Sequence, residues 1–339
     1  MGLFNTKYWN KNAGTKISYL VLSLTPLFIV SGLRGSNIGT DTWNYLRGFR
    51  NIATTSFNNV FSLERWEPGY LIINKLSSII SYNEQVILIV TSFLSLAGVG
   101  YFIYKNSTNV VFSLYLFVSL YLYLFSFNGI RQAIAISIIA IGFHYIINRK
   151  LIRYIVVVAL ASLFHQTSIL LLVLYFIYGL RANIKVLALL ASVFAVVWAI
   201  LDRLILVVIR NSNTLSYLES GQLFEGSGLL FPLISASILF LLVYIKFSES
   251  IRDKDLDFFI ILTLLSLFNN LLSLEIALFV RFSYFFMVFY ILAIPYSLRL
   301  IKKKEKRIIL SYTTIILTLS YLAIRLSQGW HGVVPYQIY

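Results

Sequence analysis

The sequence predicts an all-α polytopic membrane protein with about 11 transmembrane helices, in a range of about 10–12. Hydrophobic residues make up 59% of its 339 residues and charged residues only 12%, against about 25% charged in ordinary globular proteins. Apolar runs of spanning length repeat from Val21 to Arg325. The net charge of +15 lies mostly in short segments between these runs. Lys and Arg in such segments report membrane orientation, so the charge does not indicate nucleic-acid binding.

The apolar runs define the crossings in chain order. The first run is too long and too late in the chain for a cleaved signal peptide. In addition, Arg34 rather than a small-residue cleavage site follows it. We interpret 151–180 as two short helices with a break near His165, because one crossing there would place the basic cluster 298–307 outside. The predicted crossings are 17–33, 86–104, 109–127, 131–147, 152–164, 166–180, 186–209, 229–246, 257–275, 278–297 and 308–326.

The distribution of charge gives the orientation. One set of segments carries 18 of the 28 Lys and Arg residues and 5 of the 13 acids, which leaves 10 basic residues and 8 acids for the other side. The positive-inside rule makes the first set cytoplasmic, so the N-terminus is expected inside and the C-terminus outside. That set consists of 1–16, Lys105, 148–153, 181–185, 246–257 and 298–307.

The longest polar segments are expected on the outer side. We expect segment 34–84 to form a sizeable periplasmic loop and segment 210–228 to form a second outer loop. Within the first loop, 68–81 is too short and too polar to span, which favours an amphipathic helix on the surface or a re-entrant one. No internal repeat or linker divides the sequence, so we expect a single membrane domain over 1–339.

Four ionisable residues fall at the outer ends of the predicted helices, where such groups are functional candidates by default. They are Arg34, Arg131, Arg281 and His165. An arginine in the first turn of a helix adds a delocalised cation to free N–H groups and a positive dipole end, which suits a diphosphate. The alternative for each is an interfacial anchor that reaches lipid phosphate. His165 is either a base at neutral pH or a hydrogen-bonded structural residue.

Carboxylates gather in the predicted outer loop. Asp41 either caps a helix that begins at Trp43, or orients Arg34, binds sugar hydroxyls or acts as a base. Glu64 and Glu67 lie beside an aromatic residue, a composition that suits sugar binding. The sequence has no phosphate loop, no His-Glu-x-x-His and no cysteine. We therefore expect no metal and no cofactor.

Taken in order, several motifs resemble the EpsG-like family of Wzy-type polysaccharide polymerases. Each motif is short, so the specificity lies in their order and in the surrounding helices. The matching stretches are Arg34…Gly39-Thr-Asp-Thr-Trp-Asn-Tyr45, Phe61…Glu67-Pro-Gly-Tyr70, Asn128-Gly-Ile-Arg-Gln-Ala-Ile-Ala135, Ala161-Ser-Leu-Phe-His-Gln-Thr-Ser168, Arg281-Phe-Ser-Tyr-Phe285 and Pro335-Tyr336.

The resemblance implies a bacterial inner-membrane glycosyltransferase that needs no nucleotide. It would join oligosaccharide repeat units carried on undecaprenyl diphosphate into O-antigen, capsule or exopolysaccharide on the periplasmic face. It also implies a chain-length regulator as a partner. A lipid-linked oligosaccharide flippase and a membrane scaffold are the alternatives. The expected site has His165 and Asp41 as catalytic candidates, and Arg34, Arg131, Gln132, Arg281, Glu67, Tyr45 and Tyr336 as diphosphate- or substrate-binding residues.

Overall fold

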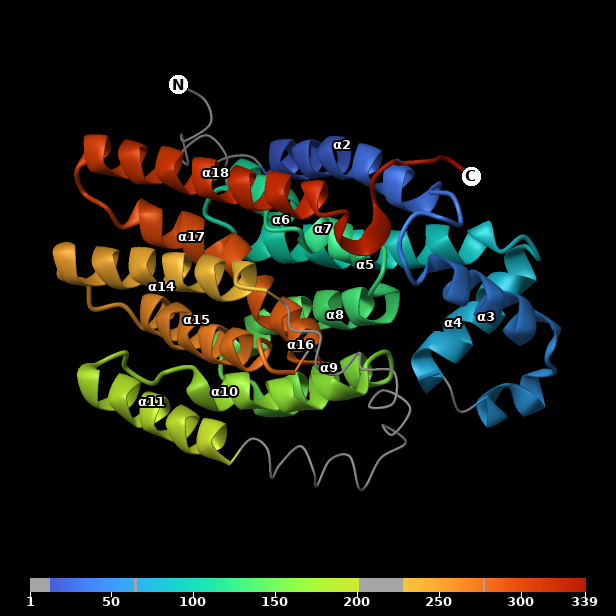
Figure 1. The fold of residues 1–339 in the computed structure, drawn as a ribbon, viewed down its shortest axis with the longest axis horizontal. Helices are drawn as coiled ribbons and strands as arrows, with labels where there is room; N and C mark the ends of the chain where they lie inside the picture. Colours follow the sequence, from blue (N-terminus) through green and yellow to red (C-terminus); the bar gives the residue numbers. More distant parts are fainter. Residues whose placement is uncertain (1–12, 64–65, 201–227, 277) are drawn as a thin grey trace. The chain divides into compact units, whose positions relative to one another are not determined.

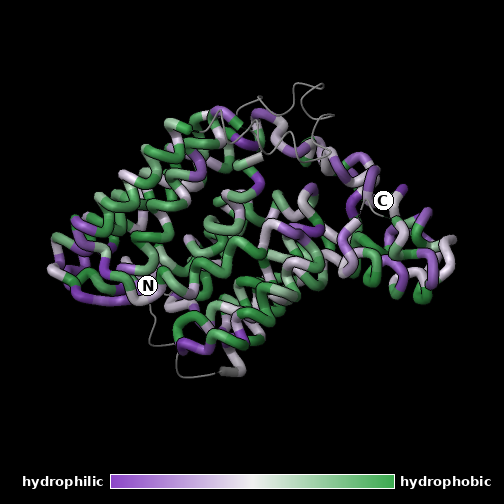
Figure 2. Tube along the Cα trace, turned by 90° about the horizontal axis from the view of Figure 1, so that it is seen from below, coloured by the Kyte–Doolittle hydropathy of each residue, from purple (hydrophilic) through white to green (hydrophobic). Residues whose placement is uncertain are grey.

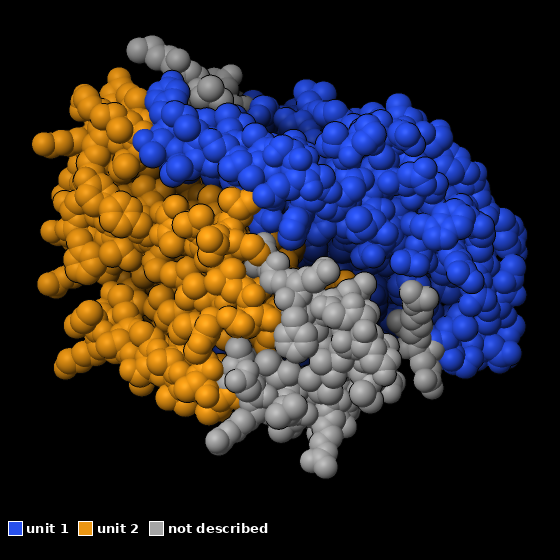
Figure 3. Space-filling model, in the orientation of Figure 1, with its two compact units in different colours: residues 1–175, 312–339 blue, residues 176–311 orange. Residues whose placement is uncertain are grey.

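The computed structural model describes residues 13–63, 66–200, 228–276 and 278–339. Within these residues the chain is helical, with short 3-10 segments and one isolated β-bridge (Figure 1). The predicted all-α class is therefore confirmed. The chain divides into two compact units, one of residues 1–175 and 312–339 and the other of residues 176–311 (Figure 3). A single membrane domain over the whole chain stays a prediction.

Seven of the described helices are long and apolar enough to cross a membrane. The chain is therefore a multi-pass membrane protein, whereas the count of about 11 crossings stays a prediction. The long helices are α2 (Ala13–Gly32), α5 (Gln85–Asn106), α8 (Ile130–Ile147), α14 (Leu230–Ser248), α15 (Lys254–Leu272), α16 (Leu278–Met287) continued by α17 (Tyr290–Arg299), and α18 (Lys304–Ser327). Shorter apolar helices occupy the other four predicted crossings: α6 (Val110–Ser119), α9 (Leu151–Ser162), η2 (Gln166–Leu172) with α10 (Val173–Ile177), and α11 (Ile184–Ala199).

Large apolar side chains cover the outside of the long helices. Only 11% of the α2 span and 22% of the α18 span are buried, and Leu22 and Ile309 are 74% and 64% exposed. Figure 2 shows hydrophobic residues along the helices and hydrophilic residues mainly at their ends and connections. So much contiguous apolar surface is unfavourable in water, and lipid chains would cover it.

Contacts between α2 and α5 define the two opposite ends of this helix pair in the first unit. At one end, the ammonium of Lys16 donates a hydrogen bond to the Tyr104 carbonyl near the end of α5. At the other end, Gln85 at the start of α5 donates to the Gly32 carbonyl at 2.6 Å. The next segment, α6 with α7 (Leu122–Phe125), returns to this second end, because Phe127 accepts a hydrogen bond from Arg34 there. This segment therefore covers the same depth as its long neighbours.

The predicted break near His165 is confirmed. Helix α9 ends at Ser162, and η2 begins after His165 and runs back alongside α9. The Tyr154 hydroxyl donates to the Leu171 carbonyl at 2.8 Å. The two other ends of this helical hairpin are also joined. The Arg149 guanidinium donates to the Tyr175 carbonyl at 2.6 Å, and the Tyr175 hydroxyl donates to the Arg149 carbonyl at 2.9 Å. The hairpin therefore starts and ends at one level and makes no net crossing.

The segment between α2 and α5 folds into α3 (Thr42–Thr54), η1 (Phe57–Ser62) and α4 (Pro68–Ile80), which lie at one end of the α2–α5 pair (Figure 1). A proline occupies the first turn of α4, where its missing N–H costs nothing. Tyr70 and Asn74 are buried on one face of α4, while Leu76, Ile79 and Ile80 are 53–78% exposed. The predicted amphipathic helix is present, and its place at the periplasmic membrane surface stays a prediction.

The C-terminal tail returns to the segment that follows α2. Arg34 and Ile338 form an antiparallel bridge, and the Gly35 N–H donates to the Gln337 carbonyl at 2.8 Å. The Gly39 N–H donates to the Gly332 carbonyl at 3.0 Å. The tail therefore lies at the same end of this unit as Arg34.

Candidate functional site

Three of the predicted site residues meet at one end of the first unit. A carboxylate oxygen of Glu67 accepts a charge-assisted hydrogen bond from the Arg131 guanidinium. The other carboxylate oxygen lies 3.8 Å from Nδ1 of His165. Their side chains are 10%, 22% and 18% exposed, so the group is sheltered but open to a ligand. We call Glu67, Arg131 and His165 the Glu67 cluster.

Two glycines allow these distant segments to meet. The Gly69 N–H donates to the Leu163 carbonyl at 2.8 Å, and a Cβ at residue 69 would lie 2.8 Å from the same oxygen. This close approach puts the start of α4 against the end of α9. At Gly129, a Cβ would run into the Phe125 ring. A glycine there lets the chain turn into α8, so that Arg131 falls in its first turn.

An aromatic group surrounds the ion pair. The rings of Tyr45, Trp66 and Tyr70 have centroids 5.3–5.8 Å apart. The Arg131 guanidinium lies 5.0 Å from the centroid of a Trp66 ring, at a distance that favours a cation–π contact. The Tyr45 side chain is also hydrogen-bonded to Arg131. Burial raises the pKa of Tyr70, so its hydroxyl stays neutral. The predicted residue Gln132, 3% exposed, follows Arg131 inside α8.

Arg34 is buried rather than open to a ligand. It is 1% exposed, and it donates hydrogen bonds to the carbonyls of Ser31 and Phe127. Its guanidinium lies 5.0 Å from the centroid of the Phe127 ring. Burial lowers its pKa to about 10, which still leaves it charged at neutral pH. No carboxylate pairs with it among the described residues, so its charge adds positive potential here.

The expectation that Asp41 caps a helix beginning at Trp43 is wrong. Helix α3 begins at Thr42, and the Asp41 side chain makes no capping hydrogen bond. The reason is local: φ −100° and ψ −5° put Asp41 itself in the helical region, whereas a capping side chain needs an extended backbone. The Asp41 N–H instead faces Oδ1 of Asn128 at 3.4 Å. Within the described residues, no bond joins its carboxylate to Arg34.

Asn128 was not among the predicted site residues, although it belongs to the motif that contains Arg131. Its Nδ2 donates to the Thr40 hydroxyl at 2.7 Å and lies 2.7 Å from Nδ1 of His331. It thereby joins the turn before α8 to the loop before α3 and to the tail. The signal was faint: Asn128 precedes a glycine in the Arg131 motif. The predicted residue Tyr336 holds the tail against α2, because its hydroxyl donates a hydrogen bond to the Val30 carbonyl at 2.6 Å.

Arg281 belongs to the second unit. It lies in the first turn of α16, as predicted, and its residue is exposed. The start of α16 is held to the end of α15, because Nδ2 of Asn269 donates to the Ser283 hydroxyl at 2.8 Å and to the Phe279 carbonyl at 2.9 Å. Glu64 and the second predicted outer loop, 210–228, lie outside the described residues, apart from Gly228.

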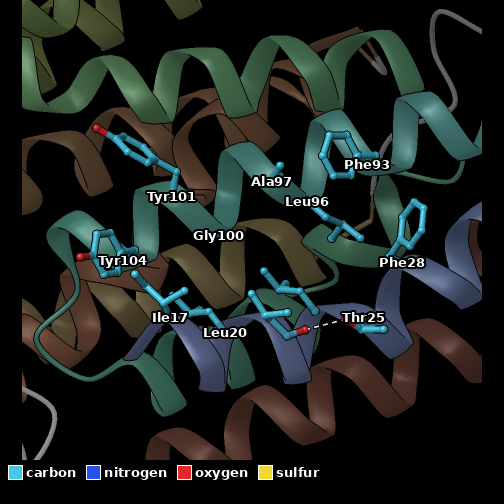
Figure 4. A pocket seen from close by; sticks show the side chains of 12 residues that line it. Ile17, Leu20, Thr25, Phe28, Phe93, Leu96, Ala97, Gly100, Tyr101 and Tyr104 are labelled. Atoms are coloured by element: carbon cyan, nitrogen blue, oxygen red, sulfur yellow. Dashed lines mark hydrogen bonds between the residues drawn. The ribbon is translucent and has the colours of Figure 1, made fainter. Parts of the chain in front are cut away.

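An apolar groove of about 530 Å³ runs between α2 and α5 (Figure 4). We call it the α2–α5 groove. Gly100 allows the two helices to approach, because a Cβ there would lie 2.7 Å from a methyl of Leu24. The Thr25 hydroxyl in its wall donates to a backbone carbonyl of its own helix, as Figure 4 shows. The groove therefore offers almost wholly apolar surface.

These features define a multi-pass helical membrane protein with a charged, aromatic-lined site at the helix ends. The model of the EpsG family matches residues 17–338, nearly the whole chain. The chain therefore belongs to the EpsG family, a family of Wzy-like polymerases, and the resemblance seen in the motifs is confirmed. Membership indicates a polysaccharide polymerase of the glycosyltransferase-like kind. No curated protein and no solved structure matches the chain.

Proposed function

We propose that this protein joins oligosaccharide repeat units carried on undecaprenyl diphosphate, on the periplasmic face of the bacterial inner membrane. The observation that carries the proposal is the Glu67 cluster, in which an imidazole and a guanidinium face the two oxygens of one carboxylate. Family membership supports this reaction class, and the charge distribution supports an orientation with the N-terminus cytoplasmic and the C-terminus periplasmic. The family also favours a chain-length regulator as a partner.

The proposed reaction transfers a growing chain from its lipid carrier to the next unit. A hydroxyl of the acceptor sugar attacks the anomeric carbon of the chain and gives its proton to the base. The bond between that carbon and the diphosphate oxygen breaks, and undecaprenyl diphosphate leaves with the electron pair. No oxidant, metal or nucleotide is needed. Two groups do the chemistry: a base for the hydroxyl and a cation for the leaving diphosphate.

His165 is the base in this proposal. With its Nδ1 facing the Glu67 carboxylate, the favoured neutral tautomer carries its proton on Nδ1, so Nε2 is the nitrogen that would take the proton of the hydroxyl. The carboxylate also stabilises the imidazolium formed on proton transfer. The 3.8 Å separation exceeds a hydrogen bond, and catalytic contacts of this kind commonly tighten when substrate binds. Asp41 is the alternative base, since its carboxylate makes no capping bond.

Arg131 stabilises the leaving diphosphate. Its Nε is buried without a hydrogen-bond partner among the described residues, and it lies at the positive end of α8. Glu67 and Trp66 hold the guanidinium in place. Arg34 adds positive potential. Arg281, in the second unit, stays a proposed diphosphate-binding residue in its own right. The apolar α2–α5 groove is the proposed resting place for part of the isoprenoid chain.

Deletion of the gene, followed by gel analysis of the surface polysaccharide, tests the proposed function. A polymerase deletion leaves single repeat units on the lipid acceptor and no ladder, and the wild-type gene restores the ladder. Loss of single units as well would indicate a flippase. A change in ladder length alone would indicate a scaffold or regulator. Either of the last two results would overturn the proposal.

A further inference from the structure

A second feature of the first unit is a hollow of about 730 Å³ against α3. We call it the α3 hollow. Its size is that of a site for a small molecule, typically about 300–1,000 Å³. Its described walls come from α3, from the end of η1 and from the residues that lead to α4. They are Asn44, Arg47, Gly48, Asn51, Ser62, Leu63 and Trp66.

The sequence of α3 builds this hollow directly. Residues 44, 47, 48 and 51 recur at helical spacing and share one face, while Tyr45, Phe49 and Ile52 are buried on another. A Cβ at residue 48 would lie 2.8 Å from Cζ2 of Trp66. Glycine at this position therefore lets the indole lie directly against the helix as a wall of the hollow.

The lining has the chemistry of a sugar site. The side-chain amides of Asn44 and Asn51 each offer donors and an acceptor, which suit hydroxyl groups that do both. The indole of Trp66 offers an apolar surface for the C–H groups of a sugar ring. Trp66 also contacts the Arg131 guanidinium, so one side chain joins the hollow to the Glu67 cluster. A sugar held here would lie next to the reacting end of the same oligosaccharide.

Arg47 adds a charge to this lining. No described residue forms an ion pair with it, and no acid is among the described residues that line the hollow. By contrast Arg50, three residues further along α3, is already engaged by both carboxylate oxygens of Glu84. A guanidinium fork matches a carboxylate with two parallel hydrogen bonds. The hollow therefore favours a ligand that brings its own anion.

We propose that the α3 hollow binds a sugar ring of the repeat unit that carries a carboxylate. Trp66 packs against the ring, Asn44 and Asn51 bond its hydroxyls, and Arg47 pairs with its carboxylate. This inference rests on the proposed function for the identity of the oligosaccharide. It goes further because it assigns a specificity site beside the reacting end and names the acidic sugar as the recognised class.

Binding of free oligosaccharide tests the inference separately from polymerisation. The probe is a fluorescently labelled single repeat unit, cut from the surface polysaccharide of the parent cell and freed of lipid and diphosphate. A second probe is the same fragment with its carboxyl groups chemically reduced. Fluorescence polarisation with the purified full chain is expected to show binding of the first probe and about tenfold or more weaker binding of the second, as loss of a charge-assisted pair predicts.

Variants of the lining sharpen the test. Arg47→Gln is expected to bind both probes equally and weakly. The double variant Asn44→Ala with Asn51→Ala is expected to bind both probes more weakly than wild type does. Matched controls are Arg50→Gln on the same helix and Asn58→Ala in η1, neither of which lines the hollow; both are expected to bind as wild type. Size-exclusion profiles show whether each variant is folded. If Arg47→Gln does not fold, Arg47→Lys takes its place in the test, because it retains the charge and loses the guanidinium fork.

Three results would overturn the inference. They are a parent polysaccharide without acidic sugars, equal binding of the two probes by wild type, and undiminished binding by the lining variants. Its failure is distinguishable from that of the proposed function, because Glu67→Gln is expected to bind the first probe normally and to form no ladder. A Glu67→Gln variant that forms full ladders would count against the proposed chemistry and leave the hollow untouched.

Discussion

Glu67 contacts the two groups to which the proposal gives chemical roles, the guanidinium of Arg131 and the imidazole of His165. From the sequence it was one of two outer carboxylates beside an aromatic residue, with a role in substrate binding. In the structure its two carboxylate oxygens face different partners, Arg131 and His165. A carboxylate that orients both a cation and an imidazole is a positioning residue. It is also the charge that keeps the sheltered Arg131 compensated in the absence of substrate.

Replacement of His165 by glutamine tests the base. Gln keeps a hydrogen-bonding side chain but cannot take a proton at neutral pH. Since a positioned base contributes about 10²–10⁴-fold, we expect His165→Gln, like His165→Ala, to leave single repeats and no long chains on a polysaccharide gel. The control is His144→Gln, at an exposed residue near the other end of α8. A normal ladder from His165→Gln would make the histidine structural and leave Asp41 as the base.

Lysine in place of arginine separates charge from geometry. We expect Arg131→Lys and Arg281→Lys to lose most polymerisation at wild-type protein level, because an ammonium cannot reproduce the bidentate fork on a diphosphate. Arg153→Lys, at an exposed residue of α9, is the matched control. Full-length ladders from both Arg131→Lys and Arg281→Lys would identify these residues as membrane anchors and contradict the anion-binding role.

At the scale of elements, the contact between α4 and α9 decides whether the Glu67 cluster forms. We expect Gly69→Ala to destabilise the fold by about 1–3 kcal/mol, because the added methyl would meet the Leu163 backbone oxygen. It should also reduce polymerisation, since the start of α4 carries Glu67. Thermal unfolding in detergent and the polysaccharide ladder measure the two effects. Gly14→Ala, which has open space around it, should change neither. An unchanged midpoint for Gly69→Ala would contradict the close approach.

Several elements could be predicted from the sequence because their signals are local. The break near His165 followed from charge placement, and the helix after Pro68 from its length and polarity. The grouping of Arg131, His165 and the outer loop at one end followed from the order of crossings. The Asp41 cap was mispredicted because its backbone adopts a helical conformation that no residue type dictates.

Other parts of the site depend on contacts between distant segments. Asn128 and His331 are 203 residues apart, and nothing in the tail's composition indicates that it returns to the loop after α2. The same holds for Gly48 and Trp66, which form a wall of the α3 hollow only after α3 has packed. The sequence therefore supplied the residue types of the site, and packing supplied which of them meet.

For the whole molecule, topology is the feature that the proposal needs most. The hairpin from Arg149 to Tyr175 returns to its starting level, so it leaves the side of the following chain unchanged. With the charge asymmetry, we expect a reporter fused at Lys304 to read cytoplasmic and one fused after Gly329 to read periplasmic. Alkaline phosphatase and green fluorescent protein fusions measure this. Two fusions on the same side would contradict the orientation.

The most direct test of the Glu67 cluster is polymerisation by the purified chain in liposomes. The substrate is the native repeat unit on undecaprenyl diphosphate, and the readouts are chain length on a gel and release of undecaprenyl diphosphate. We predict long chains from wild type and from Glu84→Gln, whose carboxylate pairs with Arg50 outside the cluster. Glu67→Gln should be slowed about 10²–10⁴-fold while it stays folded and binds the free repeat unit. Equal chain lengths from Glu67→Gln and wild type would contradict the central role of this cluster.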